Sequence, residues 1–381
     1  MQTRHVIFVN RYFHPDHSAT SQLVSDLAFH LASRGWTVEV VTSRQSYDDP
    51  RARLLPRERV RGVTIHRVAT TTFGRMFLAG RAVDYVTFYV SAFITLMKHA
   101  RRGTVVVAMT DPPLISVVAA FAAFLSRAIL VNWIQDLFPE VAEALGVLKR
   151  GASLLRRPRD WSLRRARTNV VLGELMANRI GAILPRSRAG SIAVRHNWAV
   201  DELVAVPKTD NPLRAEWSLG DRFVVAYSGN LGRAHDFSAI IAAMHELPEI
   251  TFLIVGGGAQ LETVKKAAAD LANVQFRPYQ PRELLSASLS AADAHLVTLQ
   301  PDLEGLIVPS KLYGVLAAAR PAIFIGDPEG EAARIIREYD CGLIVRNDDT
   351  EALVTSLRGL AADPKKGVVM GMRGRALYES H

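Results

Sequence analysis

The chain has 381 residues, of which 49% are hydrophobic and 22% charged, so it can bury the cores of two or three globular domains and is not a disordered protein. Its single cysteine, Cys341, excludes an intrachain disulfide and lies in an apolar run typical of a core residue. Residues 1–200 hold 28 Lys and Arg against 13 Asp and Glu, whereas residues 201–381 hold 18 against 24. This asymmetry indicates two units that meet different partners.

In the first half of the chain, apolar strands alternate with helical patterns. The N-terminus lacks the apolar core and cleavage site of a signal peptide, and residues 5–10 are expected to form the first strand. A polar loop then leads into a helix that Gly35 ends, and residues 44–62 are charged and loop-like. Further strands are expected at 36–42, 63–69, 104–109, 128–134 and 169–173, with a strand and turn at 191–198, and further helices at 82–97, 114–125 and 174–184.

The second half repeats this alternation with shorter loops. Residues 199–221 contain Pro207 and Pro212 among charged residues and are expected to form the linker between domains. Strands are predicted at 223–228, 251–255, 274–276, 294–299, 322–325 and 342–345. Strands alternating with helices form parallel, doubly wound sheets, so the sequence predicts an α/β fold with two Rossmann-like domains in tandem.

One stretch of the second half has the pattern of an anion site. Residues 223–237 (FVVAYSGNLGRAHDF) place a buried strand before a loop with Gly229 and Gly232 and then the start of a helix. Glycines let the backbone approach an anion, free N–H groups at the helix N-terminus point toward it, and Arg233 adds a positive charge. An ordinary turn between a strand and a helix is the alternative interpretation. The same alternatives apply to the three glycines at 256–258.

A second candidate anion contact lies further along the chain. In residues 308–321 (VPSKLYGVLAAARP), Ser310 is a possible N-cap that places Lys311 on the first turn of a helix. Lysine is unfavourable against the helix dipole at that position unless an anion is present. Arg233 and Lys311 are therefore expected on neighbouring loops at one edge of the second sheet. Neither the dinucleotide fingerprint nor the Walker sequence occurs.

An ordered set of motifs runs from the first strand to about residue 346. It resembles the retaining glycosyltransferases of family 4 with the GT-B fold, and among them the subgroup associated with colanic acid and other bacterial exopolysaccharide or O-antigen assembly. The motifs include NRYFHPDHSATSQLVSDLAFHLASRGWTVEVVTS (10–43), TDPPLIS (110–116), QDLFPE (135–140), YSGNLGR (227–233), IVGGGAQ (254–260), VPSKLYGVLAAARP (308–321) and GDPEGEAARII (326–336).

The resemblance implies two domains whose parallel sheets face each other across a cleft. Residues 1–205 would bind the acceptor, residues 206–365 would bind the donor, and residues 366–381 would begin a helix that crosses back to the first domain. A sugar would pass from a UDP- or GDP-linked donor to a saccharide acceptor carried on a lipid diphosphate. The implied alternatives are a sugar-nucleotide 2-epimerase of similar architecture and a non-catalytic protein that binds nucleotide sugars.

The resemblance also assigns site residues. Asp136 would lie near the reacting carbons of the sugar and act in catalysis, although a helix N-cap before Leu137 is the alternative role. The donor would be held by Gly229, Asn230, Gly232, Arg233, Ser310 and Lys311 around the diphosphate, with Arg277, Pro278 and Tyr279 bordering the nucleobase. The acceptor side would include His14, His17 and Ser18, with Ser18 and Ala19 in the place of the family's usual glycine pair.

One departure from the family pattern concerns the sugar and ribose. Many members carry two glutamates eight residues apart before the alanine-rich helix, and those places are Leu306 and Gly314 here. Glu304 and Glu331 lie nearby, and Glu331 is the expected substitute for the ribose contact.

The expected mechanism uses neither a metal nor a cofactor. The chain contains no Asp-x-Asp motif, and N–H donors with cations at Arg233 and Lys311 can stabilise a leaving diphosphate. The sequence His14-Pro15-Asp16-His17 could hold a metal, but a polar loop on the acceptor side is the preferred interpretation.

The basic first half has an expected partner. Its Lys and Arg side chains and the apolar helices at 82–97 and 114–125 suit docking on an anionic membrane, at the cytoplasmic face of the plasma membrane. The alternative places both helices in the core and leaves the arginines as a solvated face. No nucleic-acid-binding motif is present, so nucleic acid is not an expected partner.

Overall fold

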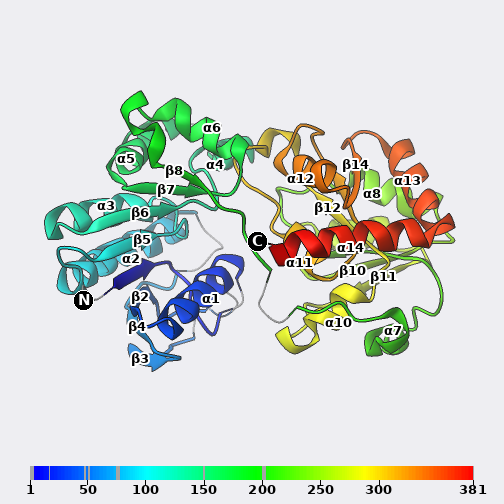
Figure 1. Ribbon diagram of the computed structural model, residues 1–381, viewed down its shortest axis with the longest axis horizontal. Coiled ribbons are helices and arrows are strands. Elements are labelled where there is room, and N and C mark those ends of the chain that lie inside the picture. Colours follow the sequence, from blue (N-terminus) through cyan, green and yellow to red (C-terminus); the bar gives the residue numbers. More distant parts are fainter. Residues whose placement is uncertain are drawn as a thin grey trace. The chain divides into compact units, whose positions relative to one another are not determined.

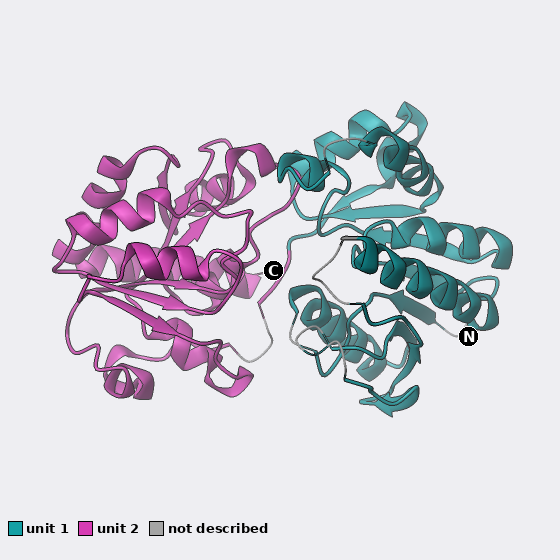
Figure 2. Cartoon of the chain, turned by 180° about the vertical axis from the view of Figure 1, so that it is seen from behind, with its two compact units in different colours: residues 1–196 teal, residues 197–381 magenta. Residues whose placement is uncertain are grey.

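The computed structural model describes residues 4–16, 18–46, 49, 52–73, 78–148, 151–199 and 203–380. The chain divides into two compact units, residues 1–196 and residues 197–381, which Figure 2 shows in different colours. Each unit contains one sheet flanked by helices (Figure 1). The predicted fold of two tandem Rossmann-like α/β units with parallel sheets is confirmed.

The first unit is built on an eight-stranded sheet with the order β3-β4-β2-β1-β5-β6-β7-β8. All its strand pairs are parallel except β3 with β4 at one edge. The strands are β1 (His5–Val9), β2 (Thr37–Ser43), β3 (Arg57–Val60), β4 (Val63–Val68), β5 (Val105–Ala108), β6 (Ile129–Trp133), β7 (Thr168–Val171) and β8 (Ile192–Val194).

Six α-helices lie among the described residues of this unit. They are α1 (Ala19–Ser33), α2 (Leu78–His99), α3 (Ile115–Ser126), α4 (Glu140–Ala144), α5 (Ala152–Arg165) and α6 (Glu174–Ile183). The helices α2 and α3 pack side by side on one face of the sheet. Their buried side chains, such as Phe88, Leu96 and Ala119, share one apolar core with Ile7 and Val41 of the strands.

The second unit has a six-stranded sheet, entirely parallel, with the order β11-β10-β9-β12-β13-β14. The strands are β9 (Val224–Ser228), β10 (Thr251–Val255), β11 (Val274–Arg277), β12 (Ala294–Thr298), β13 (Ala322–Ile325) and β14 (Gly342–Val345). The helices are α7 (Pro212–Glu216), α8 (Ser238–Glu246), α9 (Leu261–Ala267), α10 (Leu285–Ser290), α11 (Lys311–Ala317), α12 (Glu331–Tyr339), α13 (Thr350–Ala362) and α14 (Pro364–Ser380). Cys341 is fully buried, as expected.

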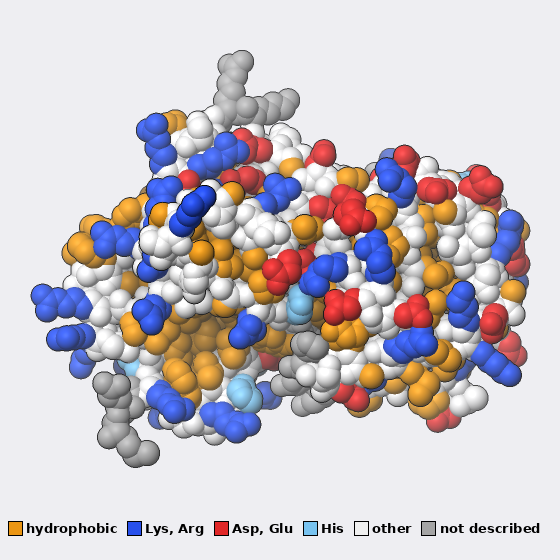
Figure 3. Space-filling view, turned by 45° about the horizontal axis from the view of Figure 1, so that its top comes forward, with side chains coloured by type: hydrophobic (Ala, Val, Ile, Leu, Met, Phe, Trp, Pro, Cys, Tyr) orange, Lys and Arg blue, Asp and Glu red, His pale blue; other side chains and the backbone are white. Residues whose placement is uncertain are grey.

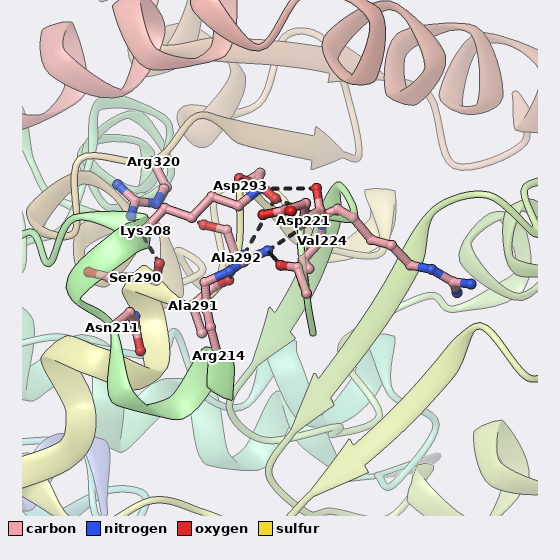
Figure 4. Close-up of polar contacts among 12 residues, drawn as sticks. Lys208, Asn211, Arg214, Asp221, Val224, Ser290, Ala291, Ala292, Asp293 and Arg320 are labelled. Atoms are coloured by element: carbon pink, nitrogen blue, oxygen red, sulfur yellow. Dashed lines mark hydrogen bonds and ion pairs between the residues drawn. The ribbon is translucent and has the colours of Figure 1, made fainter. Parts of the chain in front are cut away.

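A polar network attaches the predicted linker to the second unit (Figure 4). The carboxylate of Asp293, just before β12, accepts hydrogen bonds from Val224 N at 2.8 Å and Lys208 Nζ at 3.3 Å. The guanidinium of Arg214 donates to Ala291 O at 2.5 Å. Arg320 donates to the carbonyl oxygens of Val206, Ser290 and Ala292 at 3.0, 2.9 and 2.7 Å. Apart from the exposed Lys208, these groups are partly or fully buried, so the segment from residue 206 onward is part of the second unit's fold.

The division between the units falls after His196, nine residues before the predicted end of the first domain at 205. Ala199 and Leu203 are buried in one apolar cluster with Leu289 and Tyr313 of the second unit. The sequence also predicted that the last helix returns to the first domain. That helix, α14, packs on α11, α12, α13 and β14 of the second unit.

Three elements of the first unit were not predicted, and the short helix α4 is one of them. The edge strand β3 lies in the segment 44–62, which was expected to be a loop. The helix α5 occupies the basic segment around Trp161, with Pro158 inside it. The other strands and the helices α1, α3 and α6 agree with the predicted ones within a few residues, whereas α2 extends beyond the predicted 82–97 at both ends.

Candidate functional site

Two glycine loops interlock at the carboxyl edge of the second sheet. Gly229 N, after β9, donates to Val255 O at 2.8 Å, and Leu231 N donates to Gly257 O at 2.7 Å. Gly229, Gly256 and Gly258 have φ of 129°, 132° and 140°, where other residues are strained. A Cβ at Gly256 would lie 2.2 Å from Gly229 O. The course of the first loop therefore depends on the absence of side chains at Gly256 and Gly258 in the second.

Lys311 lies across this pair of loops. It is the first residue of α11, as predicted, and Ser310 occupies the N-cap position without a capping hydrogen bond from its side chain. A Cβ at Gly229 would lie 2.8 Å from Lys311 Cε, so the lysine stem passes directly over the glycine. Its Nζ lies 2.9 Å from Nε2 of His235 and 5.2 Å from the ring centre of Tyr227.

His235 presents a neutral acceptor to this ammonium group. Its Nδ1 lies 2.5 Å from Thr298 O and donates to it, which leaves Nε2 to accept from Lys311. Burial, together with the charge of Lys311, lowers the pKa of His235 to about 3. Burial also lowers the pKa of Lys311 to about 7. A buried lysine held against a neutral imidazole is stabilised by any anion that binds beside it.

The remaining predicted residues of the first loop lie on its outer side. Asn230 and Arg233 are exposed, and Gly232 lies between them. Gln260 Nε2 donates to Gly232 O at 2.6 Å and to His235 O at 2.8 Å, which fixes the course of this loop. Neither His235 nor Gln260 was predicted as a site residue. The only available signal was their position in the loops after two adjacent strands.

The predicted nucleobase residues follow β11, beside the two glycine loops. Tyr279 is 59% exposed, its ring lies over Gly257, and its hydroxyl donates to Gly257 O at 3.3 Å. Pro278 is exposed, whereas Arg277 is half-buried and donates from Nη2 to Gln275 Oε1 at 3.0 Å. The strand order β11-β10-β9 brings these residues and the Gly229–Arg233 loop to one edge.

The two glutamates near this edge are buried. Glu304 Oε2 accepts from Glu331 N at 3.3 Å, at the start of α12, and a Cβ at Gly330 would lie 2.3 Å from Glu304 Oε1. Glu331 is only 1% exposed, and its carboxylate forms an ion pair with Arg334. Glu331 is thus engaged inside the unit, and the ribose contact expected of it stays a prediction.

In the first unit, Asp136 lies beyond the carboxyl end of β6. The next helix, α4, begins at Glu140 with Pro139 as its N-cap, so the alternative role of Asp136 as an N-cap before Leu137 is wrong. The Asp136 side chain is reached by solvent, although the protein around it desolvates the carboxyl and raises its pKa to about 6. A pocket of about 30 Å³ that it lines also includes Thr110, Asn132 and Phe138.

An ion pair holds the loop that carries Asp136. The buried guanidinium of Arg159, on α5, donates to both carboxylate oxygens of Glu140 at 2.7 and 2.9 Å and to Phe138 O at 2.9 Å. Such a bidentate contact fixes geometry as well as charge. Arg159 therefore positions the loop between β6 and α4, and it lines the same pocket as Asp136.

The predicted acceptor-side residues lie in a turn after β1. His14 N donates to Ser25 Oγ at 3.1 Å, and its ring packs edge-on against Phe29 with 5.5 Å between ring centres. Ser18 N donates to Asp16 Oδ1 at 2.8 Å immediately before α1. His17 lies outside the described residues. The structure thus places His14 and Ser18 in one turn, and the metal alternative for this segment stays untested.

The fold defines the class of the protein, which is that of the GT-B glycosyltransferase structures. HepE of Anabaena, solved with UDP and glucose, matches with a TM-score of 0.73 and 15% identity over 99% of this chain and 95% of its own. WaaG, a glycosyltransferase involved in lipopolysaccharide biosynthesis, matches with a TM-score of 0.69 and 15% identity over 99% and 95%. At this level of identity the likeness concerns the fold.

Sequence comparison identifies the family. Residues 211–377 match the family model of glycosyl transferases group 1. The glycosyltransferase WbjE of Pseudomonas aeruginosa is 31% identical over 293 residues, which cover 73% of this chain and 71% of WbjE. The colanic acid biosynthesis glycosyl transferase WcaI of Escherichia coli is 25% identical over 377 residues, covering 94% and 92%. The chain belongs to the glycosyl transferases of group 1.

Proposed function

We propose that this glycosyltransferase moves a hexosyl group from a nucleotide-diphosphate sugar to a saccharide, with retention of the anomeric configuration. The observation that carries this proposal is the position of Lys311, whose stem crosses Gly229 and whose ammonium group faces a neutral imidazole. A departing nucleoside diphosphate gains negative charge in the transition state, and a preorganised cation with loop N–H groups stabilises that charge. This arrangement supplies the required charge without a metal or another cofactor.

The nucleotide is proposed to lie along the carboxyl edge of the second sheet. Its diphosphate contacts the Gly229–Arg233 loop and Lys311, and its base packs on the exposed ring of Tyr279. HepE has been solved with UDP-glucose. A relative from Mycolicibacterium smegmatis, 30% identical over 183 residues, is named a GDP-mannose-dependent mannosyltransferase. We therefore propose a UDP- or GDP-linked donor.

The acceptor is proposed to be a growing bacterial polysaccharide on a lipid diphosphate. WcaI is named for colanic acid biosynthesis and WaaG for lipopolysaccharide biosynthesis, which supports a polysaccharide pathway. Asp136 is proposed to position the acceptor hydroxyl or to stabilise positive charge on the reacting sugar carbon. Its place beyond β6, at the edge of the sheet where ligands of α/β units bind, supports this role.

The first unit is further proposed to dock on the anionic cytoplasmic face of the plasma membrane. No helix in the described part of the chain is long and apolar enough to cross a membrane. One face of α2 nevertheless exposes an apolar stripe at helical spacing, made of Val83, Val86, Val90, Ile94 and Met97. The neighbouring helix α3 exposes Phe121, Phe124 and Leu125.

Basic side chains accompany this apolar surface. Arg165, on α5, places its guanidinium 4.8 Å from the ring centre of Phe124. Lys98, Arg101, Arg102 and Arg127 are exposed near the ends of α2 and α3. Figure 3 shows Lys and Arg side chains interspersed with hydrophobic ones over the part of the molecule formed by the first unit. Apolar helix faces bordered by Lys and Arg suit the surface of an anionic bilayer.

Donor binding tests the proposal directly. Isothermal titration with UDP, GDP and their sugars should give one tight ligand class, and Lys311→Ala and Arg233→Ala should each weaken it by about 10- to 100-fold, since each removes a charge-assisted contact. Lys266→Ala, which removes an exposed lysine on α9, is the control and should bind as wild type. Unchanged affinity in both site variants would refute the assignment.

Turnover separates a transferase from a binding protein. With the donor identified, Asp136→Asn should lower the rate of transfer to a lipid-linked saccharide much more than it lowers donor affinity. The anomeric configuration of the product reports retention, and activity in EDTA reports independence from metal. Epimerised free nucleotide sugar, formed without an acceptor, would instead favour the epimerase alternative.

A further inference from the structure

Three imidazoles converge on one carboxylate beneath α2. Glu39 Oε2 lies 2.5 Å from Nε2 of His66 and 3.0 Å from Nδ1 of His99. The rings of His66 and His99 lie with their centres 4.2 Å apart. Glu39 Oε1 lies 2.9 Å from Nε2 of His5, whose Nδ1 is 3.1 Å from Thr104 Oγ1. The four side chains come from β2, β4, the last turn of α2 and β1.

This cluster is separate from the residues proposed to take part in transfer. Glu39 and His66 lie on the face of the sheet that α2 covers, since Val41 and Val68, two residues further along each strand, belong to the core that α2 buries. His5 is the first residue of β1, whereas His14, Ser18 and Asp136 all follow the carboxyl ends of strands. The cluster therefore lies toward the opposite edge of the sheet.

The donor atoms have the composition of a transition-metal site. The ligand atoms of Glu39, His66 and His99 all lie within 4.8 Å of one another. A tetrahedral Zn²⁺ with bonds of about 2.0–2.2 Å separates its ligand atoms by roughly 3.3 Å, so small side-chain rotations suffice. Two imidazoles and one carboxylate are a known ligand set for zinc, whereas Mg²⁺ and Ca²⁺ prefer oxygen ligands alone.

The surroundings supply an outer shell and a path to solvent. His5 and Thr104 form a chain that orients Glu39 from the side away from His66 and His99, as outer-shell partners orient metal-bound carboxylates. His66 and His99 also line an open surface groove, together with Arg44, Pro56, Ser91 and Thr95. An ion can therefore reach the two histidines, and a water molecule can complete its coordination.

We propose that Glu39, His66 and His99 bind one divalent transition-metal ion of the Zn²⁺ class, with His5 orienting the carboxylate. The ion would join β2 and β4 to the end of α2 and so fix the helix that carries the apolar stripe. The site is independent of donor binding, which is proposed for the other unit.

The experiment uses the full chain stripped with EDTA and titrated with Zn²⁺ in competition with a chromophoric chelator. Wild type should bind one Zn²⁺ per chain. Glu39→Gln and His99→Gln should each lose this binding or weaken it by more than about 10-fold, and His5→Ala should weaken it by about 10- to 100-fold, as outer-shell changes do. The matched control is His30→Ala, which removes an exposed histidine of α1 and should leave binding unchanged.

Thermal unfolding distinguishes a lost site from a lost fold. Zn²⁺ should raise the Tm of the wild type and of His30→Ala but not that of Glu39→Gln, because an ion that binds the folded state stabilises it. His99 lies half-buried at the end of α2, so His99→Gln should fold and keep wild-type affinity for the nucleotide sugar. The proposal would be overturned if the wild type did not bind Zn²⁺ stoichiometrically, or if the Glu39 and His99 variants bound it with unchanged affinity. The four side chains would then form only a hydrogen-bonded cluster.

Discussion

The ammonium group of Lys311 lies 2.9 Å from a histidine that cannot share its charge, because His235 already donates its ring N–H to Thr298 O. In this environment the pKa of the lysine falls to about 7. The charge that the proposed donor site offers is therefore conditional on pH and on the ligand. An anion beside Nζ restores the charged form, since nearby opposite charge raises the pKa of a lysine.

The affinity for a nucleotide-diphosphate sugar should therefore depend on pH. Below about pH 6 the free site already holds a charged Lys311, whereas above pH 7 binding must take up a proton, so affinity should fall by up to about tenfold per pH unit. Titration calorimetry at pH 8 in buffers of different ionisation enthalpy should detect this uptake in wild type but not in Lys311→Met. A flat affinity between pH 6 and pH 9 would contradict the prediction.

Some site residues could be predicted from local sequence and others could not. Lys311 stands out because a cation is unfavourable at a helix N-terminus, and Gly229 stands out because a glycine after a buried strand is typical of a tight turn. His235 gave no such signal, since its role depends on a carbonyl oxygen 63 residues away in the chain. The ion pair between Glu331 and Arg334 likewise depends on how the folded chain packs and could not be predicted from the sequence pattern.

At the scale of elements, the two interlocked glycine loops should tolerate no side chain. Gly256→Ala combines a strained φ with a contact against Gly229 O, so we expect it to destabilise the protein by about 2–4 kcal/mol and to reduce nucleotide binding. A Cβ at Gly359, on α13, would meet no atom within 4 Å, so Gly359→Ala should leave the stability of the protein unchanged or raise it by up to about 1 kcal/mol. Urea unfolding of both variants measures this difference, and equal effects would contradict it.

The apolar stripe of α2 should govern attachment to vesicles. Val90→Glu places a charge at a 55% exposed position of the stripe, and binding to vesicles that contain phosphatidylglycerol should weaken at least several-fold. Val368→Glu changes a 59% exposed valine on α14 and should have no effect. Flotation at low and high salt provides the measurement. Equal vesicle binding by both variants would contradict the prediction and indicate that the stripe is an ordinary solvated surface.

Two of the elements that were not predicted, β3 and α5, share a physical reason. The strand β3 (RERV) is an edge strand whose residues are exposed or half-buried, so it lacks the buried apolar alternation that identifies a strand. The helix α5 is rich in arginine and contains Pro158, both of which obscure a helical pattern. Strands buried on both faces were recognisable because continuous apolar runs are typical of parallel sheets.

At the scale of the molecule, the second unit should fold by itself when it begins at residue 197. A fragment that begins at residue 206 lacks Ala199 and Leu203, whose side chains are buried in that unit. It also lacks the Leu203 carbonyl oxygen, which accepts a 2.8 Å hydrogen bond from Arg375. The 197–381 fragment should therefore have the higher Tm and bind nucleotide like the full chain. Differential scanning calorimetry of both fragments tests this, and equal Tm values would place the boundary at the predicted position.

The fold of both units was predictable because alternating strands and helices leave few topologies for a chain of this length. The boundary between the units was less predictable from the sequence. Prolines and charges mark residues 199–221 as irregular, but the hydrogen bonds of Arg214 and Arg320 that bind this segment to the second unit leave no trace in its composition.

The dependence of the first glycine loop on Gly256 and Gly258 has a consequence for sequences related to this one. A related protein could keep every charged residue of the proposed donor edge and still lose the proposed nucleotide binding, if one side chain appeared at 256 or 258. A Cβ at position 258 would lie 2.4 Å from Asn230 Oδ1, so the loop beside Lys311 would have to move. The glycines at 256 and 258 are thus a more stringent marker than Lys311 of which related proteins keep the proposed nucleotide binding.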